Sequence, residues 1–414
     1  MEMNKVPAAN RVFIAFFGRR NAGKSSLVNA VTGQHLALVS DVKGTTTDPV
    51  YKAMELPPLG PVVIIDTPGF DDEGELGAMR VNRVKQVLRK TDLAVLVLDG
   101  GLPFEPQCSD TMFDTAMSDA DVELINKFIT NKIPYIIVLN KSDLCNTDSI
   151  GMAKTSEILP VSAKDGYNIN LLKDKIASLA INEESNKKLI AGLIRPGDFV
   201  VLVTPIDKAA PKGRLILPQQ QVLRDILDTG SIAIAVKESE LSHLMENIGK
   251  KPALVITDSQ VFAQVSLIVP PQIPLTSFSI LFARYKGFLE TAVKGAITLD
   301  NLNDGDNILV CEGCTHHRLC DDIGTVKIPH WIKSHTGKEV LFHFCSGGDF
   351  PDDITPYKLI IHCGSCMLNE REVLYRKTFA KEQNIPFTNY GTAIAHLQGI
   401  LKRSIAMFDE LTGV

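Results

Sequence analysis

A segment near the amino terminus has the residue types and spacing of a phosphate-binding loop. Residues 18–25 read G-R-R-N-A-G-K-S and match the pattern G-x-x-x-x-G-K-[ST]. The apolar run Val12–Phe17 precedes the loop and the helical pattern Lys24–Val31 follows it, as the motif requires. In such a loop, backbone N–H groups surround phosphates, the lysine reaches the β- and γ-phosphates, and the serine ligates Mg²⁺. We expect nucleotide contacts from Gly18, Asn21, Ala22, Gly23, Lys24, Ser25 and Ser26.

A second motif, D-T-P-G at residues 66–69, follows the apolar run Val62–Ile65. Asp66 would hold Mg²⁺ through water, and the Gly69 N–H would sense the γ-phosphate. The motif is expected at the carboxyl end of a strand, where parallel strands of an α/β sheet present their ligand-binding residues.

Two later motifs concern the base. N-K-S-D at residues 140–143 follows the run Tyr135–Leu139, and the Asp143 carboxylate can accept two hydrogen bonds from the N1–H and N2–H groups of guanine. Adenine lacks this donor pair, so the motif favours GTP over ATP. The apolar runs Leu93–Leu98 and Ile158–Val161 complete a set of five expected strands. After the last of these runs, the Ala163 N–H could meet the guanine oxygen. The expected base site comprises Asn140, Lys141, Asp143, Ser162, Ala163 and Lys164.

These motifs resemble those of the translation-factor-related GTPases, which include tRNA-modification and ribosome-assembly GTPases. Residues 44–48, G-T-T-T-D, match their switch motif and make Thr46 the expected second Mg²⁺ ligand. Phe70 stands where Ras-like proteins have a water-positioning Gln, and no catalytic Arg can be assigned. In the similar subgroup, an Asn at the place of Asn21 helps to bind K⁺, which supplies that positive charge. The resemblance implies slow, K⁺-stimulated hydrolysis, with Lys24, Asn21, Thr46 and Gly69 as the catalytic residues.

A second group of residues could bind a metal. Six of the eight cysteines lie between residues 311 and 366, namely Cys311, Cys314, Cys320, Cys345, Cys363 and Cys366. Without an export signal, this clustering indicates metal binding rather than disulfides. Cys311, Cys314, Cys363 and Cys366 could form a closed zinc site. Alternatively, Cys314, Cys363 and Cys366 could hold a 4Fe–4S cluster with His316 and His362 nearby. The spacing alone leaves both open.

The pattern C-x-H at residues 314–316 and H-C-x-x-C at residues 362–366, combined with the GTPase motifs, resembles the HydF family of FeFe-hydrogenase maturation GTPases. The resemblance covers essentially the whole chain. It implies a homodimer whose 4Fe–4S cluster is bound by Cys314, Cys363 and Cys366, with His316 and His362 ligating iron, contacting the cluster or shaping its loop. It further implies a scaffold or carrier of the diiron precursor of the H-cluster, with two radical-SAM maturases and apo FeFe-hydrogenase as partners.

The expected fold class is α/β throughout. A P-loop GTPase domain, with a parallel sheet covered by helices on both faces, would span residues 1–182. A smaller α/β dimerisation domain would span residues 190–270, and an α/β cluster domain residues 271–414. The expected strands of the middle domain are Phe199–Val203, Ile232–Val236, Leu254–Ile256 and Val265–Val269, and a single closing helix would carry Ile394, Leu397, Leu401, Ile405 and Phe408 on one face.

Charge and hydropathy limit the partners and the compartment. The chain of 414 residues has 43 basic and 48 acidic side chains, a net charge of −5, which argues against a dedicated nucleic-acid binder. The uncharged stretch Ser259–Ala283 contains three prolines, so we interpret it as two buried strands with a connector rather than a membrane span. We expect a cytoplasmic protein without nucleic-acid or membrane partners. The alternative function is a zinc-containing GTPase of tRNA modification or ribosome assembly.

Overall fold

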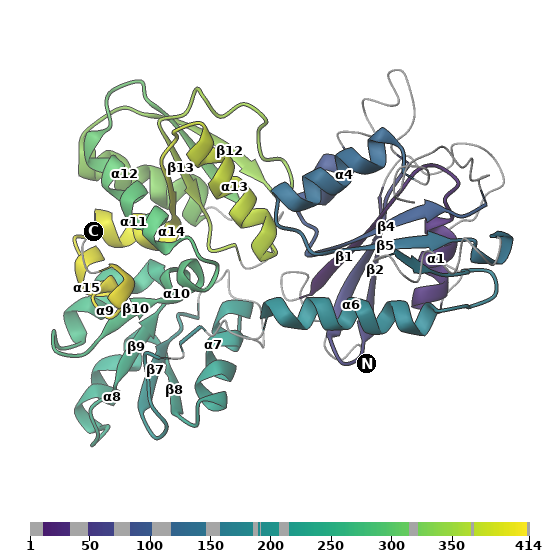
Figure 1. The fold of residues 1–414 in the computed structure, drawn as a ribbon. Coiled ribbons are helices and arrows are strands. Elements are labelled where there is room, and N and C mark those ends of the chain that lie inside the picture. The colour runs from purple at the N-terminus through teal and green to yellow at the C-terminus, as the bar shows by residue number, and fades with distance from the viewer. Residues whose placement is uncertain are drawn as a thin grey trace. The chain divides into compact units, whose positions relative to one another are not determined.

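A computed structural model describes residues 11–33, 49–69, 83–101, 117–145, 158–184, 189–190, 192–206, 215–313, 322–365 and 368–411. The chain divides into two compact units, residues 1–186 and 187–414, and each is described by itself (Figure 1). Within the described ranges, the helices fall short of the length and apolar character that crossing a bilayer requires.

A six-stranded sheet forms the centre of the amino-terminal unit. Its spatial order is β2 (Val50–Leu56), β3 (Gly60–Asp66), β1 (Val12–Phe17), β4 (Leu93–Asp99), β5 (Tyr135–Asn140) and β6 (Ile158–Pro160). All neighbours are parallel except β2, which runs antiparallel to β3 at the edge. The five strands expected from apolar runs are confirmed. β2 was not expected, because its alternation of buried and exposed residues lacks a continuous apolar run.

Helices cover both faces of this sheet, as predicted. Side chains from alternate positions of β1 pack on α1 (Lys24–Thr32) and α6 (Ile169–Glu184) on one face. The other positions pack on α4 (Asp119–Thr130) and on the helical residues 83–88. Figure 1 shows α4 and α6 on opposite sides of the strands. Because β1 is buried on both faces, it is apolar at every position.

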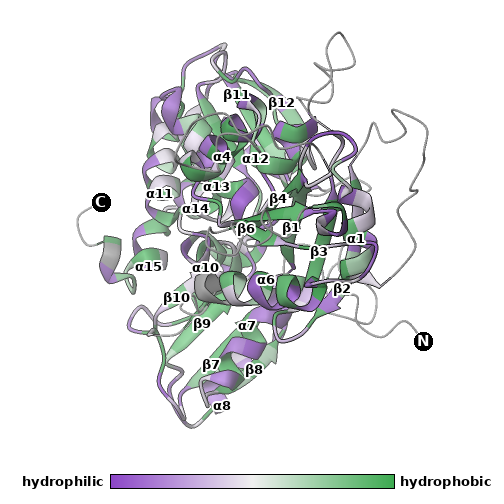
Figure 2. Ribbon diagram, turned by 45° about the vertical axis from the view of Figure 1, so that its right-hand side comes forward, coloured by the Kyte–Doolittle hydropathy of each residue, from purple (hydrophilic) through white to green (hydrophobic). Residues whose placement is uncertain are grey.

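The carboxy-terminal unit contains two parallel four-stranded sheets. The first has the order β10 (Leu275–Ser277), β9 (Leu254–Thr257), β7 (Phe199–Val203) and β8 (Ile232–Val236). The second has the order β12 (Leu341–Ser346), β11 (Asn307–Glu312), β13 (Leu359–His362) and β14 (Phe387–Asn389). In Figure 2 the strands of these sheets are mainly in the hydrophobic colour, and the inner strands β7, β9, β11 and β13 are buried, whereas the edge strands β8 and β12 consist mostly of exposed or half-buried residues.

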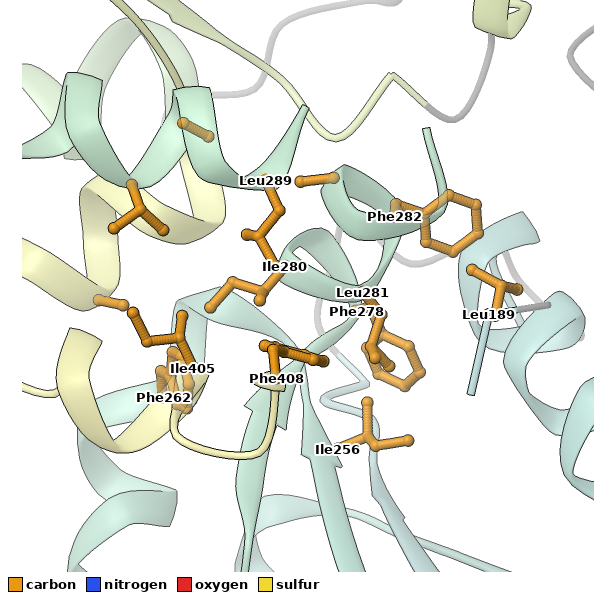
Figure 3. Close-up of a cluster of buried hydrophobic side chains, with 14 of the residues drawn as sticks. Leu189, Ile256, Phe262, Phe278, Ile280, Leu281, Phe282, Leu289, Ile405 and Phe408 are labelled. Carbon is orange, nitrogen blue, oxygen red and sulfur yellow. The ribbon is translucent and has the colours of Figure 1, made fainter. Parts of the chain in front are cut away.

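One continuous core joins the two sheets. The helices of this unit are α7 (Leu217–Asp228), α8 (Leu241–Asn247), α9 (Phe262–Ile268), α10 (Phe278–Tyr285), α11 (Leu289–Ile297), α12 (Ile328–Thr336), α13 (Glu370–Glu382), α14 (Tyr390–Leu397) and α15 (Leu401–Ile405). Figure 3 shows α10 side chains meeting Ile256 from β9 and Phe408 near the carboxy terminus. Residues of β11, β13 and α13 belong to the same hydrophobic cluster.

Two expectations about this unit are wrong. Val265–Val269 is not a strand, because α9 runs from Phe262 to Ile268 and buries Phe262 and Val265, three residues apart, while Leu267 is 89% exposed. The segment Ser259–Ala283 therefore holds α9, β10 and α10 rather than two strands. A short apolar run fits either a buried strand or a helix, and here the three-residue spacing decides.

The closing helix is also two helices rather than one. Gly399, with φ +70°, separates α14 from α15. Glycine adopts this left-handed conformation without steric cost, so it ends the first helix. Ile394 consequently packs in the core of the second sheet, whereas Ile405 and Phe408 pack in the core shared with the first sheet.

Candidate functional site

The phosphate-binding loop connects β1 to α1. Gly23 precedes α1 with φ +84°, and a Cβ atom there would lie 2.2 Å from Asn140 Nδ2, so only glycine fits. The Lys24 ammonium donates hydrogen bonds to the carbonyls of Gly18 (2.9 Å) and Arg19 (2.7 Å), which places it above the loop. Asn21 is exposed at the loop's turn, with φ +61°. Ala22 is buried beneath it, and Ser25 and Ser26 follow in the first turn of α1.

Ser25 and Asp66, the two described residues of the predicted magnesium site, are in direct contact. Ser25 Oγ donates to Asp66 Oδ2 at 2.6 Å, although the residues are 41 positions apart. Asp66 Oδ1 is buried and has no hydrogen-bond partner among the described residues. Burial raises the pKa of Asp66, and the Ser25 hydrogen bond with the charges of Lys24 and Lys52 opposes this rise. A buried oxygen without a partner beside a serine hydroxyl fits Mg²⁺, which prefers hard oxygen ligands.

Gly69, which the sequence predicts to contact the γ-phosphate, lies against the phosphate-binding loop. A Cβ atom at Gly69 would lie 2.9 Å from the Arg20 backbone nitrogen. Thr67 anchors this segment, because its hydroxyl donates to the Phe16 carbonyl at 2.7 Å. The remaining switch residue, Thr46, lies outside the described residues.

The base-recognition residues form one hydrogen-bonded group beside the loop. Asn140 Nδ2 donates to the Ala22 carbonyl at 3.0 Å, and Asn140 Oδ1 accepts from the Ala163 N–H at 3.2 Å. Ser162 Oγ donates to Asp143 Oδ1 at 2.9 Å and so orients the carboxylate. Lys141 Nζ is bound to Asp99 at 2.8 Å, and Lys164 Nζ lies 3.9 Å from Asp143 Oδ2. The motifs predicted from the sequence therefore converge.

Arg19 does not serve as a free cation at this site. Its Nε lies 3.4 Å from Asp121 Oδ2, and Asp121 is fully buried where it caps the first turn of α4. The guanidinium is thus attached to α4. The sequence assigned no catalytic arginine, and this contact gives Arg19 a partner on α4.

The described part of the cysteine site lies where β11 and β13 end side by side. Cys363 Sγ accepts hydrogen bonds from the Gly313 N–H (3.0 Å) and the Ser365 N–H (3.3 Å). Burial raises the pKa of Cys363, whereas these two N–H groups and the charges of Lys286 and Arg376 favour the thiolate. The Lys286 ammonium donates to the Ser365 carbonyl and thereby holds the loop. Two N–H donors around one part-buried sulfur fit a thiolate that binds a metal. Cys314, His316 and Cys366 lie outside the described residues.

His362 is fully buried, and both of its nitrogens have protein partners. Nε2 accepts from Arg376 Nη1 at 3.0 Å, and Nδ1 lies 3.1 Å from the Cys363 carbonyl. Burial, followed by the nearby Arg376 charge, lowers the pKa of His362 to about 3, so the ring is neutral near pH 7. The proton on Nδ1 then donates to the Cys363 loop. This geometry favours a loop-shaping role over direct ligation of iron.

Arg376 and Glu372 support His362 from α13, and sequence reasoning missed them. Arg376 Nε donates to Glu372 Oε1 at 2.9 Å, and Nη2 donates to the Gly347 carbonyl at 2.6 Å. Both side chains are almost completely buried, with exposures of 0% and 3%. A Glu and an Arg four residues apart normally indicate an exposed helix face, so only their burial reveals this role.

Cys311, a ligand in the alternative zinc site, and Cys345 are register neighbours on β11 and β12. Both are buried in the core shared by the two sheets. Burial raises the pKa of the Cys311 thiol far above its ordinary value, and this thiol shares a hydrogen bond with Cys345. A four-cysteine zinc site would require Cys311 to leave this contact.

Comparison with protein-family models identifies three regions. Residues 189–287 match the model described as the hydrogen maturase F dimerization domain, and residues 290–407 match the hydrogen maturase F tetramerization domain. Together these ranges make up more than half of the chain. Residues 13–141 match the model described as a 50S ribosome-binding GTPase. The matched regions follow one another along the chain as a GTPase, a dimerization and a tetramerization region.

The individual relatives described here each match about half of this chain. GTPase Der of Wolinella succinogenes is 32% identical over 209 residues, 47% of this chain and 40% of the relative. The tRNA modification GTPase MnmE of Endomicrobium trichonymphae is 30% identical over 199 residues, with the same two coverages of 47% and 40%. The solved structure of Aquifex aeolicus Era bound to GDP and aluminium fluoride has 22% identity, a TM-score of 0.33, and coverages of 54% of this chain and 92% of that chain. The chain spans about 40% of the length of the two curated relatives.

Proposed function

Because the chain belongs to the hydrogen maturase F family, we propose that it hydrolyses GTP during FeFe-hydrogenase maturation and carries a 4Fe–4S cluster that receives the diiron precursor of the H-cluster. The observation that carries the proposal is the presence in one chain of converging guanine-nucleotide motifs and a part-buried thiol whose sulfur accepts two backbone N–H hydrogen bonds. The nucleotide motifs imply GTP binding, and the hydrogen-bonded thiol favours metal binding by Cys363.

In the nucleotide site, each residue would act on GTP from its observed position. Asp143, oriented by Ser162, would accept the two guanine N–H groups. The Lys24 ammonium would exchange its carbonyl partners for the β- and γ-phosphates. Ser25 and Asp66, with Thr46, would hold Mg²⁺, which neutralises charge on the phosphates when bound.

The positive charge that an arginine finger would supply is assigned to K⁺. Arg19 is paired with Asp121 on α4, and to act on the phosphates it would have to leave that carboxylate. Asn21 stands exposed at the turn of the loop, where its side-chain oxygen could ligate K⁺. The Gly69 N–H would contact the γ-phosphate and signal its loss. Hydrolysis would then serve as a switch for partner binding.

In the cysteine site, the chain's own residues would shape a three-thiolate pocket. Cys363, with Cys314 and Cys366, would bind the cluster, and His316 would lie beside it. His362 and Arg376 would position the Cys363 loop rather than bind iron, because their polar atoms already have partners. With three thiolates on four irons, the cluster offers one open iron at which a second metal unit can attach.

Self-association is supported by the edge of the first carboxy-terminal sheet. β8 is an edge strand of that sheet, and Ile232 on it is 46% exposed. An exposed apolar edge strand is suited to pairing with another chain. The matched dimerization and tetramerization domains agree with oligomer formation. We propose a cytoplasmic homodimer that interacts with two radical-SAM maturases and apo FeFe-hydrogenase.

The decisive experiment is an iron, sulfide and zinc assay on protein purified without oxygen. We expect about four iron and four sulfide per chain with a brown chromophore. Cys363→Ser should lose iron while GTP hydrolysis continues, because the thiol and the nucleotide motifs belong to different compact units. Cys145→Ser, which changes a partly exposed thiol of the amino-terminal unit, is the matched control and should keep the iron. One zinc per chain without colour would contradict the proposal and direct attention to RNA-linked GTPases.

A further inference from the structure

We propose that Asp300, His335 and His396 form a second metal site, selective for a divalent transition-metal ion such as Zn²⁺. His335 Nε2 lies 2.8 Å from Asp300 Oδ1, and His396 Nε2 lies 3.0 Å from both oxygens of the same carboxylate. One ligand atom from each residue lies within 4.8 Å of the others. The proposal is independent of the nucleotide and cluster functions.

The distances suit a small ion. Zinc lies about 2.0–2.2 Å from imidazole nitrogen and carboxylate oxygen, so tetrahedral ligand atoms are about 3.3 Å apart. The two imidazole–carboxylate contacts would therefore open by about 0.3–0.5 Å to admit the ion. Rotation of the Asp300 and His335 side chains, which are 46% and 33% exposed, can supply that movement without a change in the backbone.

Rigid elements bring the three ligands together. Asp300 belongs to the 3₁₀ turn Thr298–Asn301, His335 to the last turn of α12, and His396 to the last turn of α14. Each element is anchored by a fully buried residue of the same hydrophobic core, namely Leu299, Ile332 and Ile394. Ligands on packed elements are preorganised, which lowers the entropy cost of binding.

The electrostatic surroundings of the three side chains favour binding of a cation over binding of an anion. Both imidazoles stand at helix carboxyl ends, where the negative end of the helix dipole stabilises positive charge. The Asp300 carboxylate lies within hydrogen-bond distance of both imidazoles, so the three side chains already converge on one point. Two imidazoles and a carboxylate suit Zn²⁺ and leave a coordination position for water.

The test is a competitive Zn²⁺ titration of the full-length reduced chain. Wild-type protein should bind one more equivalent than the variant His335→Ala/His396→Ala, which removes both imidazoles. Asp300→Asn keeps the side-chain shape and should bind at least about 10-fold more weakly, because even outer-shell partners contribute about 10–100-fold to metal affinity. His343→Ala, which removes an exposed histidine on β12, is the matched control and should equal wild type.

Co²⁺ separates this site from the cysteines, since thiolate ligation adds charge-transfer absorption that imidazole and carboxylate ligation lack. The Co²⁺ absorption that wild type shows and the triad variants lack should contain no thiolate charge-transfer band. Zn²⁺ should also raise the unfolding temperature of wild type, followed by fluorescence of Trp331, the only tryptophan, but not of the triad variants. Equal zinc stoichiometry and affinity in wild type and both triad variants would overturn the proposal.

Discussion

Replacing Arg376 by methionine should destabilise the carboxy-terminal unit strongly. The guanidinium is fully buried, and it donates to Glu372, His362 and the Gly347 carbonyl. Arg376→Met leaves the Glu372 carboxylate buried at 3% exposure without its cation. Breaking a buried ion pair by removing one partner costs about 3–5 kcal/mol. We expect the free energy of unfolding to fall by that amount.

The chain provides a control with the same chemistry and spacing on its surface. Arg224 and Asp228 are also four residues apart on a helix, with Nε 2.8 Å from Oδ1, but their side chains are 77% and 56% exposed. Water and salt screen this pair, so Arg224→Met should leave unfolding unchanged within error. The comparison therefore isolates burial as the cause of the loss.

Urea denaturation followed by Trp331 fluorescence measures the effect. Trp331 packs against the core of the second carboxy-terminal sheet, and as the only tryptophan it reports on that unit alone. GTP hydrolysis by the same samples checks the amino-terminal unit. Equal unfolding midpoints and slopes for Arg376→Met and Arg224→Met would refute the reasoning.

A double variant separates the unpaired charge from lost packing. Arg376→Met/Glu372→Leu removes both charges, and replacing a buried pair by apolar residues is often nearly neutral. It should recover at least half of the lost free energy. If it recovers nothing, the lost donors to His362 and Gly347 set the cost, at about 1–3 kcal/mol for each unsatisfied group.

Three predictions concern the nucleotide site. Asp143→Asn should weaken GTP binding about 100-fold or more, since each hydrogen bond to a charged group contributes about 1.5–3 kcal/mol. The variant should favour xanthosine triphosphate over GTP. An unchanged preference for GTP in a competition assay would contradict the predicted base site. K⁺ should raise GTP turnover at least about 10-fold over Na⁺ at equal ionic strength, because one preorganised donor can change turnover about 10²–10³-fold. Asn21→Ala should abolish the difference between K⁺ and Na⁺. Ser25→Ala should raise the Mg²⁺ concentration needed for half-maximal hydrolysis at least about 10-fold; an unchanged requirement would exclude Ser25 as a ligand.

The amino-acid sequence alone predicted where the described nucleotide motifs lie on the sheet of the amino-terminal unit. Each motif is a short contiguous segment at the end of an apolar run, so its place on the sheet follows from the strand that precedes it. Asp66 and Ser25 meet because β1 and β3 are parallel neighbours whose carboxyl ends coincide. The alternation of apolar and helical runs predicts a parallel sheet, and the order of strands in that sheet determines which motifs converge.

Only the tertiary structure decided the rest. Val265–Val269 fits a strand or a helix by composition, and packing of Phe262 and Val265 selected the helix. Nothing local distinguishes the buried pair on α13 from an exposed one. Asp300 meets His335 and His396 across 35 and 96 positions. Local patterns specify segments, whereas burial and long-range contact depend on which faces pack together, and that is a property of the whole folded unit.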